Sequence, residues 1–253
     1  ASVGRSEAQG ELGCWTAPVG SRFVHHVVDR CEFELRSAEG GSQSAGALHS
    51  ECDVETVVVD RRAGETLVRQ QIHGLRFLGP GGKPITDDPI QASFAVAADA
   101  PVFVRLAAAG AILGFGFAES LDGDQRNFLR GTLGLFAFEA PARDAKEWTT
   151  HAVDTTGEFD ARYEVIGAAG DDEVAVRRTR LHYTAISGQP DLPKHELRGR
   201  GEATFRVDIG WLCTASIDEC MTLSLSLLDL HAVTQRRAEV GLVERGTVAI
   251  TDD

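Results

Sequence analysis

Acidic and amide side chains are the residues of this sequence best suited to hold a metal ion, and one group has calcium-like spacing. Asp122, Asp124 and Asn127 lie within six residues of one another. Oxygen ligands alternate along a calcium-binding loop, but Arg126 occupies the position of the third ligand and no glycine follows it. An arginine cannot ligate a cation, so we expect a solvated turn here and no calcium site.

Histidine spacing and catalytic motifs would indicate a metal centre or an enzyme. The eight histidines follow no metal-binding spacing, and adjacent residues such as His25 and His26 point to opposite faces of a strand. No nucleophile elbow, Walker A loop or zinc-protease motif is present, and Gly114-Phe-Gly116 lacks the third glycine of a dinucleotide fingerprint. We therefore expect no catalytic residue, no metal and no cofactor, and predict that the protein is not an enzyme.

The five cysteines allow two interpretations. They are odd in number and contain no C-x-x-C pair. One possibility is a disulfide across a hairpin from Cys213 to Cys220 and another between neighbouring strands from Cys31 to Cys52, which leaves Cys14 single. The alternative is five reduced, buried thiols that pack as small hydrophobic groups. Disulfides would favour an extracellular or periplasmic protein.

Charge and length exclude several classes of partner. The chain has 253 residues and a formal net charge of −13, without a basic cluster larger than two arginines, so it should repel the phosphate backbone of nucleic acids. It has no run of 18 apolar residues, so we expect no transmembrane helix. The length suits one large all-β domain.

Short apolar and β-branched segments separated by turn residues predict about ten strands. We expect a loose N-terminal arm over residues 1–20 and a single domain over 21–253, in which residues 187–253 form extra strands or a small appended sheet. Residues 37–50 should form a long connection at a hairpin tip. The predicted strands include 23–35, 54–60, 66–77, 92–97, 102–107, 111–119, 148–153, 158–166, 173–183, 203–212, 221–228 and 237–243.

The segment from Asn127 to Phe138 interrupts this β pattern. Leu129, Leu133 and Phe136 recur at i, i+4 and i+7, and a neighbouring apolar stripe makes most of the circumference hydrophobic. A helix of about 12 residues is about 18 Å long, too short to cross a bilayer, so it should be buried in protein. The alternative, a strand, gives a poorer two-sided pattern.

A central helix and many antiparallel strands together predict the fold class. A closed barrel removes exposed strand edges, and a barrel of about ten strands is too wide for its own side chains to fill. The expected fold is therefore mainly β, a large antiparallel β-barrel enclosing a short central α-helix. Gly131 and Gly134 would let the sheet approach the helix, and Arg130 needs a partner such as Asp154, because a buried unpaired charge is costly.

Two motifs make the chain resemble the N-terminal β-barrel (vitellogenin-type) domain of the large lipid transfer proteins, the family of vitellogenin, microsomal triglyceride transfer protein and apolipoprotein B. The resemblance covers about residues 20 to 185. The first motif has an asparagine, a basic residue, a glycine and an apolar run, and the second an acidic residue, a threonine, a glycine and a tyrosine. The matching residues are Asn127, Arg130, Gly131, Leu133, Leu135 and Phe136, then Asp154, Thr156, Gly157 and Tyr163.

The resemblance implies a helix inside the barrel and a non-enzymatic lipid-transport-type module that binds lipid or docks a partner. The partner would be a helical lipid-transfer domain or another protein, and the location extracellular or periplasmic. A family disulfide is missing here, since Phe159 and residues 179–186 contain no cysteine, and the helical domain that builds most of the lipid cavity does not follow. The alternative is an exported protein-interaction or adhesion β-barrel with no lipid ligand.

Overall fold

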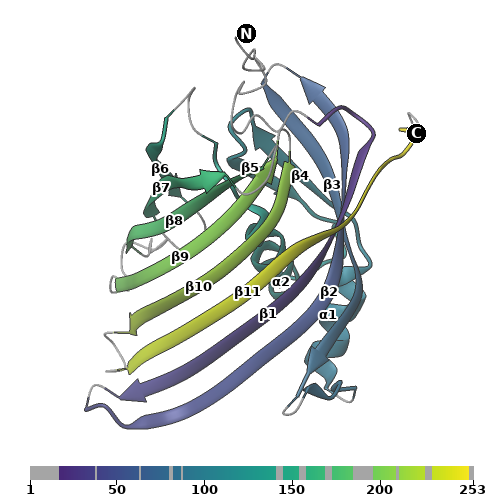
Figure 1. Ribbon diagram of the computed structural model, residues 1–253. Coiled ribbons are helices and arrows are strands. Elements are labelled where there is room, and N and C mark those ends of the chain that lie inside the picture. The colour runs from purple at the N-terminus through teal and green to yellow at the C-terminus, as the bar shows by residue number, and fades with distance from the viewer. Residues whose placement is uncertain are drawn as a thin grey trace.

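One antiparallel sheet dominates the computed structural model (Figure 1). The structure describes residues 17–37, 39–62, 64–79, 82–86, 88–140, 145–153, 158–168, 173–184, 196–208, 211–225 and 230–250. Within these ranges the sheet has eleven strands. They are β1 (Ser21–Ser37), β2 (Ser42–Arg62), β3 (Glu65–Leu78), β4 (Val102–Ala107), β5 (Ile112–Gly116), β6 (Glu147–Val153), β7 (Glu158–Ala168), β8 (Glu173–Thr184), β9 (Glu196–Asp208), β10 (Trp211–Leu225) and β11 (Leu230–Thr247).

The strand order is β5-β4-β3-β2-β1-β11-β10-β9-β8-β7-β6, so the first and last strands pair at the centre of the sheet. The edge strands β5 and β6 do not pair with each other, and the predicted closed barrel is therefore wrong: the sheet is strongly curved but open. The reason lies in the chain that joins the two edges. After β5 the chain enters the concave side of the sheet. The Ala140 N–H then donates a hydrogen bond (2.7 Å) to the carbonyl of Ala109, which lies between β4 and β5.

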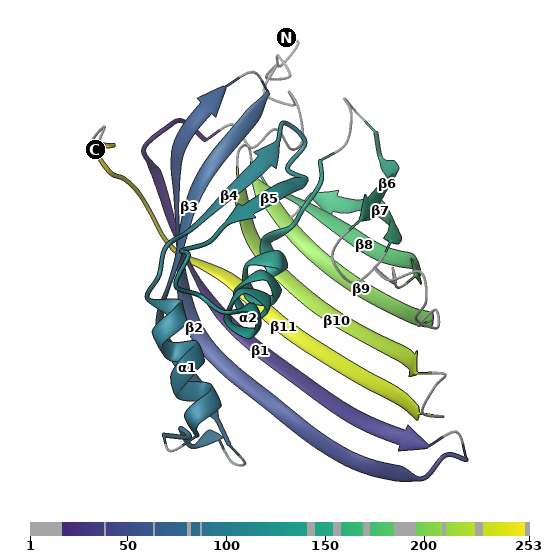
Figure 2. The same ribbon diagram turned by 180° about the vertical axis from the view of Figure 1, so that it is seen from behind.

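Helix α2 (Gly123–Leu133) continues into a 3₁₀ turn, η2 (Gly134–Phe136), and lies against the concave face (Figure 2). The helix predicted near residues 127–138 is thus present, but it begins four residues earlier. Asp122 explains the start, because its carboxylate accepts a hydrogen bond from the Gln125 N–H (2.9 Å) while the Gln125 side chain accepts one from the Asp122 N–H (3.0 Å). The buried side chains of α2 and η2 are Leu129, Thr132, Leu133, Leu135 and Phe136.

Helix α1 (Pro89–Ala98) replaces the strand predicted over 92–97. Its apolar run is short enough to suit either structure, and tertiary packing decides in favour of the helix. Phe94 stacks on Phe128 of α2 with ring centroids 4.7 Å apart, and it also packs against Phe77 of β3. Ala97 and Ala98 are buried on the same side. The helix therefore covers part of the concave face beside α2.

Two other expectations about the strands need correction. Strand β2 begins at Ser42, so the predicted connection over residues 37–50 is mostly strand. The strand predicted over 203–212 spans the end of β9 and the start of β10. Of the two possibilities for residues 187–253, the described part forms extra strands: β9 to β11 belong to the main sheet and connect β8 with β1. The predicted N-terminal arm lies almost entirely outside the described residues.

Candidate functional site

The concave face of the sheet has a covered and an uncovered part. Helix α2 and η2 lie against the covered part (Figure 2), where Val240, Ala215 and Phe205 belong to the same buried core as the apolar side chains of the helix. Towards the β1–β2 and β10–β11 turns the strands continue beyond the helices. Residues that are paired in register have side chains on the same face, so the strand register identifies the side chains of both parts.

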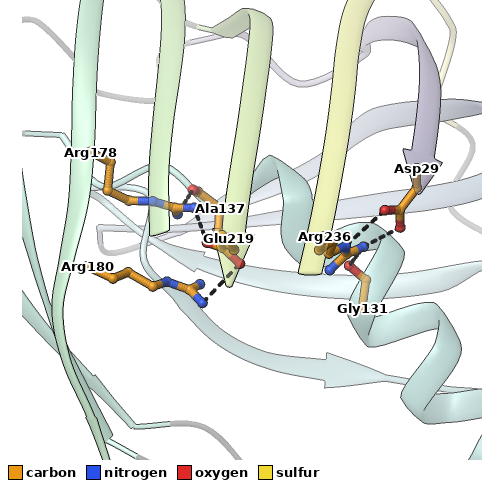
Figure 3. Close-up of polar contacts among 7 residues, drawn as sticks. All are labelled: Asp29, Gly131, Ala137, Arg178, Arg180, Glu219 and Arg236. Carbon is orange, nitrogen blue, oxygen red and sulfur yellow. Dashed lines mark hydrogen bonds and ion pairs between the residues drawn. The ribbon is translucent and has the colours of Figure 1, made fainter. Parts of the chain in front are cut away.

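A row of charged residues crosses the concave face between the two parts. The register aligns Arg180 of β8 with Gly201 of β9, Gly201 with Glu219 of β10, and Glu219 with Arg236 of β11. We call the following five residues the inner ionic row: Asp29, Arg178, Arg180, Glu219 and Arg236. Figure 3 shows their contacts.

Glu219 joins two arginines of β8 by reaching across β9. Its carboxylate accepts hydrogen bonds from Arg178 and Arg180, both at 3.3 Å. The reach depends on Gly201, since a Cβ at that position would lie 2.6 Å from Glu219 Cγ. The Arg178 and Glu219 side chains are only 7% and 8% exposed, whereas Arg180 is 23% exposed. Arg180 is therefore the member of this cluster closest to solvent.

Arg236 forms the other half of the row with Asp29 of β1. Its guanidinium donates two hydrogen bonds to the Asp29 carboxylate (3.0 and 2.5 Å) and a third to the Gly131 carbonyl of α2 (3.0 Å). Burial by itself would lower the pKa of Arg236, but the hydrogen bonds and charge of Asp29 outweigh it and raise the pKa above its usual value. Arg236 therefore remains a cation.

The sheet holds the central segment by its backbone as well as by apolar packing. Arg236 donates to the carbonyl of Gly131, and Arg178 donates to the carbonyl of Ala137 (3.3 Å), just after η2. Carbonyls at a helix C-terminus carry partial negative charge and lack partners within the helix, so arginines suit this position. The central segment is thus fixed where it meets the ionic row.

His25 lies deeper on the same face, beneath η2. It is fully buried, its Nε2 is 2.8 Å from the Leu212 carbonyl, and its ring meets Phe136 edge-on with centroids 5.1 Å apart. Burial lowers the pKa of His25 to about 4, against a smaller opposing effect of the Leu212 hydrogen bond. The neutral imidazole therefore donates from Nε2, and its role is to support the central segment.

Apolar side chains line the uncovered part of the concave face. Strand β1 alternates from Asp29 through Cys31, Phe33 and Leu35 on this face, with Leu48 opposite Cys31. The Phe33 ring lies across Gly46 of β2, where a Cβ would be 2.2 Å from Phe33 Cζ, and the residue is 49% exposed. Half-buried residues from the other two strands complete this surface, which we call the uncovered apolar face: Met221 of β10, and Leu230, Ala232 and Thr234 of β11.

The residues of the first predicted motif lie on α2 and η2, but not all in the expected roles. Leu133, Leu135 and Phe136 are buried core residues. Arg130 donates to the side chain of Asn127 (3.2 Å) and lies over the Phe117 ring at 5.0 Å. Gly131 and Gly134 have open space where a Cβ would be, so they are not needed for close approach of the sheet. Gly131 instead contributes its carbonyl to Arg236.

Only one residue of the second predicted motif can be placed. Tyr163 of β7 is buried, stacks on Trp148 with centroids 5.0 Å apart, and meets Phe138 edge-on. Burial raises the pKa of its hydroxyl. Asp154, Thr156 and Gly157 lie outside the described residues, as does the proposed pairing of Arg130 with Asp154.

The positions of the cysteines on the strands show that both predicted disulfides are wrong. Cys213 and Cys220 lie on the single continuous strand β10, with no hairpin between them. Cys52 is opposite Val27, whereas Cys31 is opposite Leu48, an offset of about 13 Å along β1. A disulfide requires Cα atoms within about 7 Å. None of the four described cysteines is in a disulfide, and burial raises the pKa of Cys52 to about 12.

Neither a metal-binding cluster nor a membrane-spanning helix is present among the residues that the structure describes. No group of three histidine, cysteine, aspartate or glutamate side chains there could hold a metal ion. Asp122 is the N-cap of α2, which explains the calcium-like spacing in the sequence. No helix in the same part of the chain has both the length and the apolar character needed to span a bilayer.

The inner ionic row was not predicted from the sequence. Most of its members lie beside buried apolar residues at the next inward position of the strand, as Arg178 follows Val176 and Arg236 precedes Ala238 and Val240. A charged residue that interrupts an apolar alternation is the signal that could have identified it. The pairing of the charges, however, depends on register between strands distant in sequence.

A curved antiparallel sheet around a short helix defines the class of fold, and solved structures with a similar fold are known. No family model and no curated protein matches the sequence. A solved structure described as "Lipid-protein interactions in lipovitellin" matches with a TM-score of 0.67 and 13% sequence identity. The match covers 93% of this chain and 26% of the lipovitellin chain, so the chain spans about a quarter of its length. The predicted vitellogenin-type resemblance thus extends to the fold.

Proposed function

We propose that this protein is a non-enzymatic, lipid-binding module of the lipovitellin type. The observation that carries the proposal is the uncovered apolar face, which lies within a fold similar to a region of lipovitellin. Phe33 leaves about half of its surface in solvent on the concave side of the sheet, whereas the described residues that meet α2 and η2 form a packed core. An exposed apolar surface of this kind is typical of a ligand or partner site.

Docking of a partner protein or domain is the second candidate. It is favoured by the edge strand β5 and its neighbour β4, where Leu113 and Phe103 are 45% and 42% exposed. An unpaired strand edge offers backbone hydrogen bonds to a partner strand. The lipovitellin chain is also much longer than this one, so further domains could pack here in a larger assembly. Adhesion or interaction without any lipid remains the corresponding alternative.

We further propose an extracellular or periplasmic location, supported by the vitellogenin-type resemblance. The four described cysteines give this no support, because they are free thiols. Fractionation of the native source, with immunodetection of the chain, would test it. Recovery with the cytosolic fraction would contradict the proposal.

Lipid binding is tested by purifying the full chain, incubating it with mixed-lipid vesicles and separating protein from vesicles by size. We expect organic extraction and mass spectrometry to detect about one lipid per protein molecule. An unrelated β-sheet protein of similar size carried through the same steps is the control. A protein that carries no more lipid than this control would contradict the lipid-binding function and favour the partner-docking alternative.

A further inference from the structure

The two edges of the sheet differ in how they are protected against pairing with another strand. The edge strand β6 carries the exposed polar residues Glu147 and His151, which both pair with charged residues of β7. The segment of residues 110–118, which contains the edge strand β5, has no charged residue and no proline. Free edges in natural proteins are usually blocked by such residues, so an uncharged apolar edge is suited to receive a strand.

Only β4 pairs with β5 among the described residues, so the other side of β5 has no partner strand in that part of the chain (Figure 2). The register shifts at Leu113, the extra residue of a bulge, and the regular edge begins at Gly114. No described atom lies within 4 Å of a Cβ placed on Gly114. Gly116 lies opposite Phe103, which is 42% exposed on the convex side. The two glycines therefore leave the convex side of the regular edge without side chains.

The same sheet shows what covers a glycine on a neighbouring strand. The Phe33 ring of β1 lies across Gly46 of β2. An aromatic side chain on a strand added beside β5 would cover Gly114 in the same way. On the inner side, Phe115 stacks on Phe117 with centroids 5.6 Å apart, so inward side chains of the added strand would also meet an aromatic surface. A charged side chain on that strand would find no opposite charge on β5.

We infer that β5 binds an extended, uncharged segment of a partner protein, which adds a strand to the sheet and places an aromatic side chain over Gly114. This inference rests on partner docking, the second candidate function, and specifies its site and its occupant; it does not depend on lipid binding. A second copy of this chain fits less well. Antiparallel pairing of two copies of β5 about Gly114 or Phe115 places glycine opposite glycine and leaves Gly114 uncovered.

The probe is a capped peptide in which tyrosine alternates with threonine, and the control peptide has serine in place of tyrosine. In fluorescence anisotropy, we expect the full chain to bind the tyrosine peptide about tenfold more tightly than the serine peptide, because the tyrosine rings bury apolar area over the edge. Gly114→Asp should weaken binding of the tyrosine peptide about tenfold, since the carboxylate would lose water against the added strand. Val243→Asp is the matched control, because it places the same charge at a 62% exposed position on β11, which four strands separate from β5. Equal binding of the tyrosine peptide by the two variants would overturn the site.

Two measurements on the unaltered chain do not depend on these variants. The tyrosine peptide should protect the amides of residues 114–117 from hydrogen exchange. N-methylation of one of the two alternate sets of peptide nitrogens should abolish binding, because only one edge of the peptide pairs with β5. Protection around Phe33 instead, no binding of either peptide, or dimerisation of the chain through β5 would each overturn the inference. Gly114→Asp should carry as much vesicle lipid as the wild type, so failure of peptide docking leaves the lipid-binding function standing.

Discussion

Arginines at inward-facing strand positions determine the polar character of the concave face. Arg178 is almost fully buried, yet its charge is balanced by Glu219 and it also donates to the Ala137 carbonyl. Charged groups so deeply buried are stable only when their hydrogen bonds are satisfied. The pairing of these residues could not be predicted from the sequence, because Glu219 is 41 residues from Arg178 and meets it only across an intervening strand.

At the residue scale, we expect Glu219→Gln to lower the free energy of unfolding by about 3 kcal/mol, because it leaves the Arg178 charge uncompensated in the core. Urea denaturation of the variant and the wild type would measure the change. Glu164→Gln is the control: Glu164 pairs with Arg177 at 3.7 Å and is 46% exposed, so its loss should cost less than about 0.5 kcal/mol. A similar cost for both variants would contradict the structural role of the row.

The lowered pKa of the buried His25 should make the free energy of unfolding depend on pH. Its pKa is about 4 in the folded protein and about 6.5 in the unfolded chain, which therefore binds the proton first as the pH falls. The contribution of the neutral His25 to the free energy of unfolding is fully present above about pH 6.5 and decreases as the pH falls from 6.5 to 4. It amounts to about 3 kcal/mol in total.

Urea denaturation between pH 4 and pH 7 would measure this effect. We expect His25→Asn to reduce the pH dependence in that range, whereas His26→Asn, at the adjacent position on the opposite face of β1, should retain it. An unchanged pH dependence in His25→Asn would show that another group is responsible.

At the element scale, the hydrophobic periodicity of the sequence was sufficient to predict an element where one face of that element is buried. It was insufficient where packing against other elements decides between helix and strand. The alternating residues of β7 and β8 predicted those strands to within about two residues of their ends. Helix α1 was missed because its short apolar run has no clear period without Phe77 and Phe128 to pack against. Barrel closure could not be predicted either, because it depends on whether β5 and β6 meet, and α2 and the chain after η2 lie between them in sequence.

The start of α2 gives a prediction at this scale. Asp122→Ala removes both the N-cap and its part of the capping box, so we expect the free energy of unfolding to fall by about 1 kcal/mol. Thermal denaturation would detect a drop of several degrees in the midpoint. Glu119→Ala, an exposed position before the helix, should change the midpoint little. If the two variants have the same midpoint, Asp122 does not stabilise the central segment.

At the scale of the whole molecule, the sheet is held together at its centre by strands from the two ends of the described chain. Strand β11 pairs with β1 on one side and with β10 on the other. Strands β1 to β5 and strands β6 to β10 therefore meet in the sheet through β11. The similarity to lipovitellin covers nearly all of this sheet, so it concerns the whole arrangement and not a local motif.

We expect truncation after Asp229, which removes β11, to abolish the cooperative unfolding transition, because β1 and β10 would both lose their shared neighbour. Truncation after Val248 should retain the transition, since it keeps β11 and the hydrogen bond from the Val248 N–H to the Gly20 carbonyl (2.8 Å). Circular dichroism during heating and size-exclusion chromatography would distinguish the two proteins. A folded monomer without β11 would contradict this account of the sheet.

The pairing of β1 with β11 also has a consequence for synthesis on the ribosome. Arg22 of β1 and its ion-pair partner Glu244 of β11 are 222 residues apart in the sequence. The hairpins of the sheet can form as they emerge, but β1 has no partner on one side until β11 has also been translated. During that interval the nascent chain exposes an open strand edge and an apolar face. This stage is when the protein would depend most on a chaperone.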